Sequence, residues 1–218
     1  PQRKGAVIIQ YFVDHPLAIS ADFIDKVAAL PNYALALPCI DDRAILGLKW
    51  PKLRCVTCSH GVPREALCDA ASIGAQRRNE VLIAGTIASE EELSQLKARV
   101  PDAVHTACDD AAELMAVNPS VSFMQAFDLC MPAGLVASDH WIMLQICSRY
   151  VVARANRARR LRTLAALRGL PVAVHGAEAW REHCTGSIEY RGATAYEQLP
   201  QVMQGSTVSL AWNPTQFT

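Results

Sequence analysis

The sequence predicts an α/β fold with parallel sheets, and three observations lead to this prediction. Short apolar runs rich in β-branched residues recur along the chain, and Gly, Asn or Pro closes most of them. Helical patterns separate several of these runs, which is typical of strand–helix–strand units. The clearest succession occupies the segment from Leu170 to the end. Ligands of such sheets gather beyond the carboxyl ends of the strands, so the residues that follow each run are the first functional candidates.

The first part of the chain reads as an open α/β half. Its apolar runs predict strands, and runs with helical spacing predict helices between them. Ser20 is suited to cap the first of these helices, because its hydroxyl can accept from an amide in the first turn. The expected strands are 6–13, 33–37 and 53–58, and the expected helices are 20–30 and 43–48.

The second part repeats the alternation with longer helices. The run Ser89-Glu-Glu-Glu92 has the pattern that opens a helix, and Gly169 has the position that ends one. The expected strands are 80–87, 170–176, 187–192 and 206–214. The expected helices are 89–100, 109–117, 119–134, 138–167, with Ser138-Asp139 as its cap, and 195–204.

Composition excludes several classes of protein. Apolar residues make up 51% of the 218 residues and charged residues 19%, as in a packed globular protein. Lys plus Arg equals Asp plus Glu at 21 each, so the net charge does not favour binding to nucleic acid. No apolar run has the roughly 18–20 residues of a spanning helix, so no membrane span is expected. Neither signal peptide nor disulfide pattern is apparent, which predicts a cytoplasmic protein with reduced, mostly buried cysteines.

A metal site is not expected. Cys55-Val-Thr-Cys58 has the spacing of one half of a zinc site, but no second Cys-x-x-Cys follows. His60 and Cys68 complete four ligands only with irregular spacing. The chain also lacks an acidic pair with the Asp-x-Asp spacing of a divalent-metal donor site.

Several motifs, taken in order, resemble those of two-domain glycosyltransferases with the GT-B architecture, and most closely spore-maturation glycosyltransferase-like proteins. The resemblance spans most of the chain, but each motif is short, so their order carries it. The motifs are Val13-Asp-His-Pro16, Cys39-Ile-Asp-Asp42, Ser59-His-Gly-Val-Pro63, the strand Val81–Thr86, Leu170–Gly176, Ile188-Glu-Tyr-Arg-Gly192, Tyr196-Glu-Gln-Leu-Pro200 and Val208-Ser-Leu-Ala-Trp-Asn-Pro214.

The resemblance implies two Rossmann-like domains: an acceptor-side domain at 1–76 and a nucleotide-sugar-binding domain at 77–218. It implies a metal-independent glycosyltransferase that needs no cofactor and moves a sugar from a nucleotide-diphosphate sugar to a glycan, lipid or protein. In the family, an acidic residue that holds the donor follows the strand matching 208–214. This sequence stops before it, so we expect an incomplete C-terminal domain. A non-catalytic binding or partner protein on the same scaffold is the alternative.

Glycosyl transfer needs a group that accepts the acceptor's proton. Asp14 and His15 end the first expected strand and are the candidates for this catalytic role. The other interpretation is a turn in which Asp14 binds the following backbone. His60 is a candidate contact to substrate, or equally a buried structural histidine.

The remaining candidates follow strands of the second half and concern the donor. The backbone at Gly85-Thr86 can approach the diphosphate, and His175-Gly176 either approaches the nucleotide or forms a tight turn. Tyr196 contacts the base or begins a helix, and Asn213 ends the last expected strand. Five arginines crowd one segment of the long expected helix. A solvated basic surface is the favoured interpretation, and contact of one of them with a phosphate is the alternative; these are Arg154, Arg157, Arg159, Arg160 and Arg162.

A third hypothesis is an unrelated α/β protein, such as a receiver-like signalling domain. Asp14 or the pair Asp41-Asp42 would then form the acidic pocket. Such a domain also needs a Lys at the end of its last strand, and no Lys follows Lys97, which disfavours this hypothesis.

Overall fold

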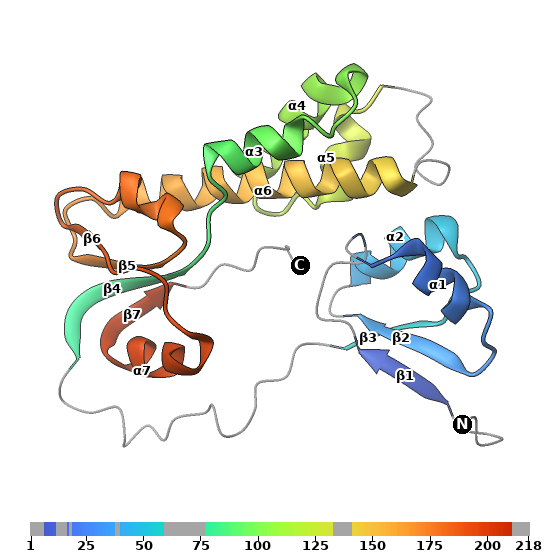
Figure 1. Ribbon diagram of the computed structural model, residues 1–218, viewed down its shortest axis with the longest axis horizontal. Helices are drawn as coiled ribbons and strands as arrows, with labels where there is room; N and C mark the ends of the chain where they lie inside the picture. Colours follow the sequence, from blue (N-terminus) through green and yellow to red (C-terminus); the bar gives the residue numbers. More distant parts are fainter. Residues whose placement is uncertain are drawn as a thin grey trace. The chain divides into compact units, whose positions relative to one another are not determined.

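The computed structural model describes residues 7–11, 17, 19–37, 40–58, 77–132 and 141–210 (Figure 1). Strands and helices alternate at the two ends of the chain, and helices follow one another from α3 to α6. In order they are β1 (Ile8–Tyr11), α1 (Ala21–Ala28), β2 (Tyr33–Leu37), α2 (Ile40–Lys49), β3 (Cys55–Thr57), β4 (Arg78–Gly85), α3 (Glu90–Lys97), η4 (Asp102–Val104), α4 (His105–Val117), α5 (Phe123–Cys130), α6 (Trp141–Ala166), β5 (Val172–Gly176), η6 (Glu178–His183), β6 (Ile188–Tyr190), η7 (Tyr196–Gln198), α7 (Leu199–Gln204) and β7 (Ser206–Leu210).

The strands form two parallel sheets, one of three strands and one of four, which confirms the predicted α/β class. The chain divides into two compact units. The first comprises 1–61, 96–152 and 215–218, and the second comprises 62–95 and 153–214. The predicted domain boundary after residue 76 falls within 59–76, outside the described residues, and stays a prediction.

The first unit contains the sheet β1-β2-β3, in which Ile8 pairs with Tyr33 and Leu35 with Cys55. Four of the five residues of the central strand β2 are buried, as its continuous apolar sequence predicts. The Ser20 hydroxyl accepts from the amide of Phe23 at 3.3 Å, which confirms the predicted cap of α1. Strand β2 and the start of α1 therefore follow from the residues in and next to each element.

The helical part of the first unit buries two cysteines, Cys108 of α4 and Cys147 of α6. Of the six cysteines in the described part of the chain, none forms a disulfide, and Cys58 is exposed. The prediction of buried, reduced thiols thus holds for Cys108 and Cys147. In the described helices, no stretch is both long and apolar enough to cross a membrane.

The second unit contains the sheet β6-β5-β4-β7, with β4 and β5 in its interior (Figure 1). Because side chains alternate along a strand, the register defines two faces. One face presents Ile83, Val172 and Val174 to Leu164 of α6 and forms the hydrophobic core of the unit. The opposite face carries polar side chains, with His175 beside Ala84 and Glu189 beside Ala173.

Helix α6 ends where the sequence predicts. Gly169, just beyond its last turn, has a φ of +94°, a left-handed conformation that favours glycine. The chain then enters β5, whose residues Val172, Ala173 and Val174 are buried. The end of α6 therefore fixes the start of the strand that carries two of the predicted site residues.

Candidate functional site

The strand order of the second unit creates a reversal at β4. From β4 the chain moves to β5 and then β6 on one side, and it returns to β7 on the other side of β4. In open parallel sheets, ligands bind beyond the carboxyl ends of the strands at such a reversal. At this position β4 ends in Gly85, and exposed Thr86 follows it. This edge is the candidate site.

Two of the predicted residues, Gly85 and Gly176, are direct partners at this edge. A Cβ built on Gly176 would lie 1.7 Å from the carbonyl oxygen of Gly85. The Trp180 indole nitrogen donates to that same oxygen at 2.8 Å, and Trp180 is fully buried. Glycine at 176 is therefore required by the close approach of β4, whatever the edge binds.

A buried arginine lies over the end of β4. The guanidinium of Arg160, on α6, lies 3.7–3.9 Å from the position that a Cβ on Gly85 would occupy. The residue is only 8% exposed, and burial lowers the pKa of its guanidinium from the ordinary value. This arrangement places a positive charge beside the carboxyl end of the strand at the reversal.

A second buried arginine, Arg157, holds the turn between β4 and α3. It donates to the carbonyl oxygen of Ala88 at 2.8 Å and pairs with Glu90 at 2.8 Å. The same guanidinium also contacts Glu182 at 3.4 Å and the His183 ring at 3.1 Å. Its charge is thus paired with carboxylates of the same unit. The side chain joins α6 to the start of α3 and to η6.

The expectation that most of the arginine cluster faces solvent is wrong for Arg157 and Arg160. Both are buried, because α6 packs against the sheet and its neighbouring turns rather than lying on the surface. Arg162, by contrast, is exposed. Long side chains allow this packing, since their methylene stems bury while the head group finds polar partners.

The N-terminus of α3 is poorly suited to a phosphate. The Ser89 amide donates to the Glu92 carboxylate at 2.7 Å, and the Glu92 amide donates to the Ser89 hydroxyl at 3.1 Å. Glu90, Glu91 and Glu92 all lie in the first turn. This capping box, expected from sequence, uses the amides that an anion would need and adds negative charge. Arg160 is therefore a better contact for an anion at this edge than the N-terminus of α3.

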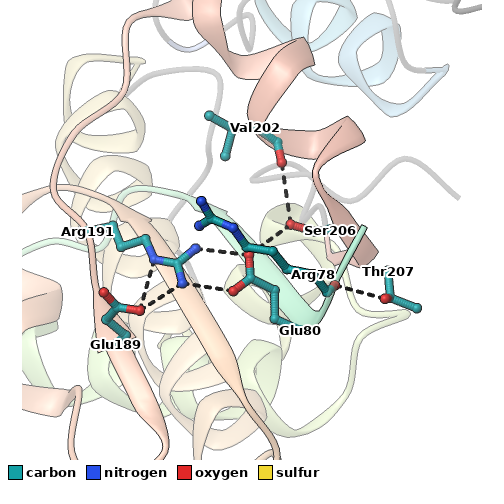
Figure 2. Close-up of polar contacts among 7 residues, drawn as sticks. All are labelled: Arg78, Glu80, Glu189, Arg191, Val202, Ser206 and Thr207. Atoms are coloured by element: carbon teal, nitrogen blue, oxygen red, sulfur yellow. Dashed lines mark hydrogen bonds and ion pairs between the residues drawn. The ribbon is translucent and has the colours of Figure 1, made fainter. Parts of the chain in front are cut away.

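The polar face of the same sheet carries a network of charged groups (Figure 2). Arg191, which follows β6, binds both oxygens of Glu80 at 2.9 and 2.8 Å. It also binds Glu189 at 2.7 Å, and the Ser206 hydroxyl donates to Glu80 at 3.4 Å. The hydrogen bond from Arg191 is the main reason that the pKa of Glu80 is lowered. The network joins β4, β6 and β7.

His175 lies on this polar face, near the carboxyl end of β5. Its Nδ1 is 2.6 Å from the Thr194 hydroxyl. Burial, and then the positive charge of Arg191, lower the pKa of the His175 ring from its ordinary value, while Glu80 and Glu189 act in the opposite direction. Burial and Arg191 therefore favour the neutral form of the imidazole.

The structure brings together the predicted residues Gly85, Thr86, His175 and Gly176 at the ends of β4 and β5. Tyr196 begins η7, as one interpretation of the sequence has it, and is 83% exposed. Four candidates lie outside the described residues, so their roles stay predictions; these are Asp14, His15, His60 and Asn213. Asp41 and Asp42, the acidic pair of the receiver-like hypothesis, lie within α2.

Sequence reasoning missed several residues of this edge. Trp180 lies in η6, a short helix that no pattern predicted, and Thr194 follows β6 without any motif. Glu80 and Arg191 are 111 positions apart, so no local signal links them. A usable signal existed only for Arg191, a charged residue at the end of the predicted strand 187–192.

No group of three or more His, Cys, Asp and Glu side chains is placed to hold a metal ion within the described ranges. Comparison of the chain with protein-family models, with curated proteins and with solved structures found no match.

Proposed function

We propose that the chain is a glycosyltransferase-like protein that binds a nucleotide-diphosphate sugar at the carboxyl edge of the β6-β5-β4-β7 sheet. In this proposal its two parallel sheets belong to two Rossmann-like domains of the GT-B type. The observation that carries it is the reversal of strand order at β4, with the Arg160 guanidinium beside Gly85. The sugar acceptor is a glycan, lipid or protein.

The proposed binding needs no metal ion. A guanidinium offers several N–H donors in a fixed plane, which suits the oxygens of a diphosphate. Arg160 is buried, so its charge is less screened than that of a surface arginine. The leaving nucleoside diphosphate would be stabilised by this charge as the bond to the sugar breaks.

The alternative is a binding or partner protein that does not use a nucleotide. One observation favours it: the first turn of α3, where such sheets often receive a phosphate, carries three glutamates. The two functions differ in whether a nucleotide stabilises the fold, so one measurement separates them.

We expect UDP, GDP or one of their sugars to raise the melting temperature by several degrees. A ligand at about 100 times its Kd stabilises by about 2.7 kcal/mol, and each kcal/mol moves the midpoint of a chain this long by about 2–4 °C. Thermal-shift assays with the diphosphates, their sugars and the bare nucleosides measure this. The nucleosides should give smaller shifts, because they lack the group that faces Arg160.

Arg160→Gln should weaken binding of the diphosphate about 10–100-fold, the loss expected when a hydrogen bond to a charged group is removed. Arg162→Gln is the matched control, since Arg162 is exposed on the same helix. Each variant is compared with its own ligand-free melting temperature. If no nucleotide raises the melting temperature of the wild-type protein at any concentration tested, the partner-protein alternative is favoured.

A further inference from the structure

The first unit carries an open groove between the end of α3 and the beginning of α6, called here the α3–α6 groove. The apolar side chains of Leu96, Ile142 and Ile146 line it together with Arg99 and Arg149. Its volume is about 130 Å³. A cavity of about 150 Å³ admits a benzene molecule, so the groove has room for one apolar side chain of the size of leucine.

The groove offers both apolar surface and positive charge. Ile142 is 71% exposed, and both arginines of the groove are exposed. Within the described ranges, neither arginine pairs with a carboxylate. Gln145 also lines the groove, but its amide already donates to the carbonyl oxygens of Leu17 and Ile19 at 2.8 and 3.0 Å. An occupant with apolar and acidic groups therefore suits this groove best.

The same unit carries a surface of the opposite kind where α5 ends beside α4. Leu129 of α5 is 73% exposed, and its neighbour Asp128 is exposed as well. Burial, and then the negative charge of Asp110, raise the pKa of the Cys130 thiol, so Asp110 of α4 lies near this end of α5. Neither aspartate pairs with a basic side chain in the part of the chain that the structure describes. Asp110, Asp128 and Leu129 form the Leu129 surface.

The two surfaces are complementary in shape and charge. One presents an exposed apolar side chain near two carboxylates, and the other presents an apolar hollow beside two guanidinium groups. Apolar patches with a charged rim are typical of protein interfaces, and opposite charges fix which surfaces meet. Since Leu129 is 73% exposed, it does not fill the groove of its own chain. A second copy can supply the occupant.

We propose that the Leu129 surface of one copy docks in the α3–α6 groove of a second copy. The proposal does not depend on the proposed function, because every residue of both surfaces belongs to the first unit. The two surfaces differ, so copies associate either through two reciprocal contacts about a two-fold axis or head to tail. Both arrangements give species larger than a monomer, and salt weakens both by screening the exposed charges.

Analytical ultracentrifugation of the full chain tests the proposal. Wild-type protein at about 200 µM should be larger than the 23.8 kDa monomer and should dissociate on dilution or in high salt. Leu129→Ser and Arg149→Asp should each raise the Kd of association about tenfold or more, as for a central interface residue. Lys26→Asp is the control. It makes the same change of charge at an exposed residue of α1 that lines neither surface, and it should associate like wild type.

A mixture of two variants tests the pairing of the charges. Asp128→Arg and Arg149→Asp should each associate weakly alone, and both replace exposed side chains, so the fold is retained. Their equimolar mixture should regain the wild-type Kd, because each variant supplies the charge that the other has reversed. Wild-type protein that stays monomeric at every concentration overturns the proposal. So does an association that Arg149→Asp leaves unchanged, or a mixture that associates as weakly as its components.

Discussion

Gly176→Ala is expected to destabilise the second unit by about 3 kcal/mol or more, the upper range for forcing extra atoms into a packed region. The added Cβ would lie 1.7 Å from the carbonyl oxygen of Gly85 and 3.1 Å from a ring carbon of Trp180. Since the first of these is backbone of the neighbouring strand, the clash is relieved only by moving β4 and β5 apart. The free energy of unfolding in urea measures this.

Gly205→Ala is the control for this prediction. Gly205 follows α7 in the same unit, its φ is −72°, and a Cβ there would meet atoms only at 3.5 Å and beyond. We expect a change within about 0.5 kcal/mol, the usual effect of a substitution that disturbs no packing. Equal stabilities for the two variants would show that β4 and β5 do not approach as described.

Glu80→Gln is expected to cost about 2 kcal/mol at pH 7. Removing one member of a fully buried ion pair costs about 3–5 kcal/mol. The Glu80 side chain is 10% exposed and that of Arg191 is 22% exposed, so solvent and Glu189 compensate in part. Glu189→Gln is the control, because the Glu189 side chain is 64% exposed, and it should cost about 0.5 kcal/mol.

The same pair predicts a dependence on pH. The pKa of Glu80 is lowered in the folded protein, chiefly by its hydrogen bond from Arg191. Its stabilising contribution is therefore complete above the unfolded value of 4.5 and is lost as the pH falls through the folded value. Urea unfolding at decreasing pH should show the gap between wild type and Glu80→Gln closing below pH 4.5. A gap that persists in acid would rule out ionisation of Glu80 as its source.

Local signals in the sequence were sufficient for most individual elements. Tyr33–Leu37 was expected as a strand and is one, and Ser20 and Ser89 cap the helices that they were expected to cap. Gly169 ends α6 in the predicted conformation. Each of these features depends on a few neighbouring residues, so the chain's local chemistry determines it.

Features that depend on distant residues were not predictable from these signals. The order β6-β5-β4-β7 brings Gly176 against Gly85, and no sequence pattern near either glycine predicts this contact. The burial of Arg160 follows from how α6 packs on the sheet, whereas its sequence suggested a solvated basic surface. The sequence therefore predicted which residues of the candidate site lie at strand ends. It did not predict the side chains that contact them.

Hydrogen exchange can locate the nucleotide that we propose to bind at the carboxyl ends of β4 and β5. Amide exchange is compared with and without UDP, at a concentration beyond which the melting temperature no longer rises. We expect slower exchange at 84–88 and 174–177, with β1, β2 and β3 unchanged. Slower exchange confined to other segments, or no change anywhere, would contradict it.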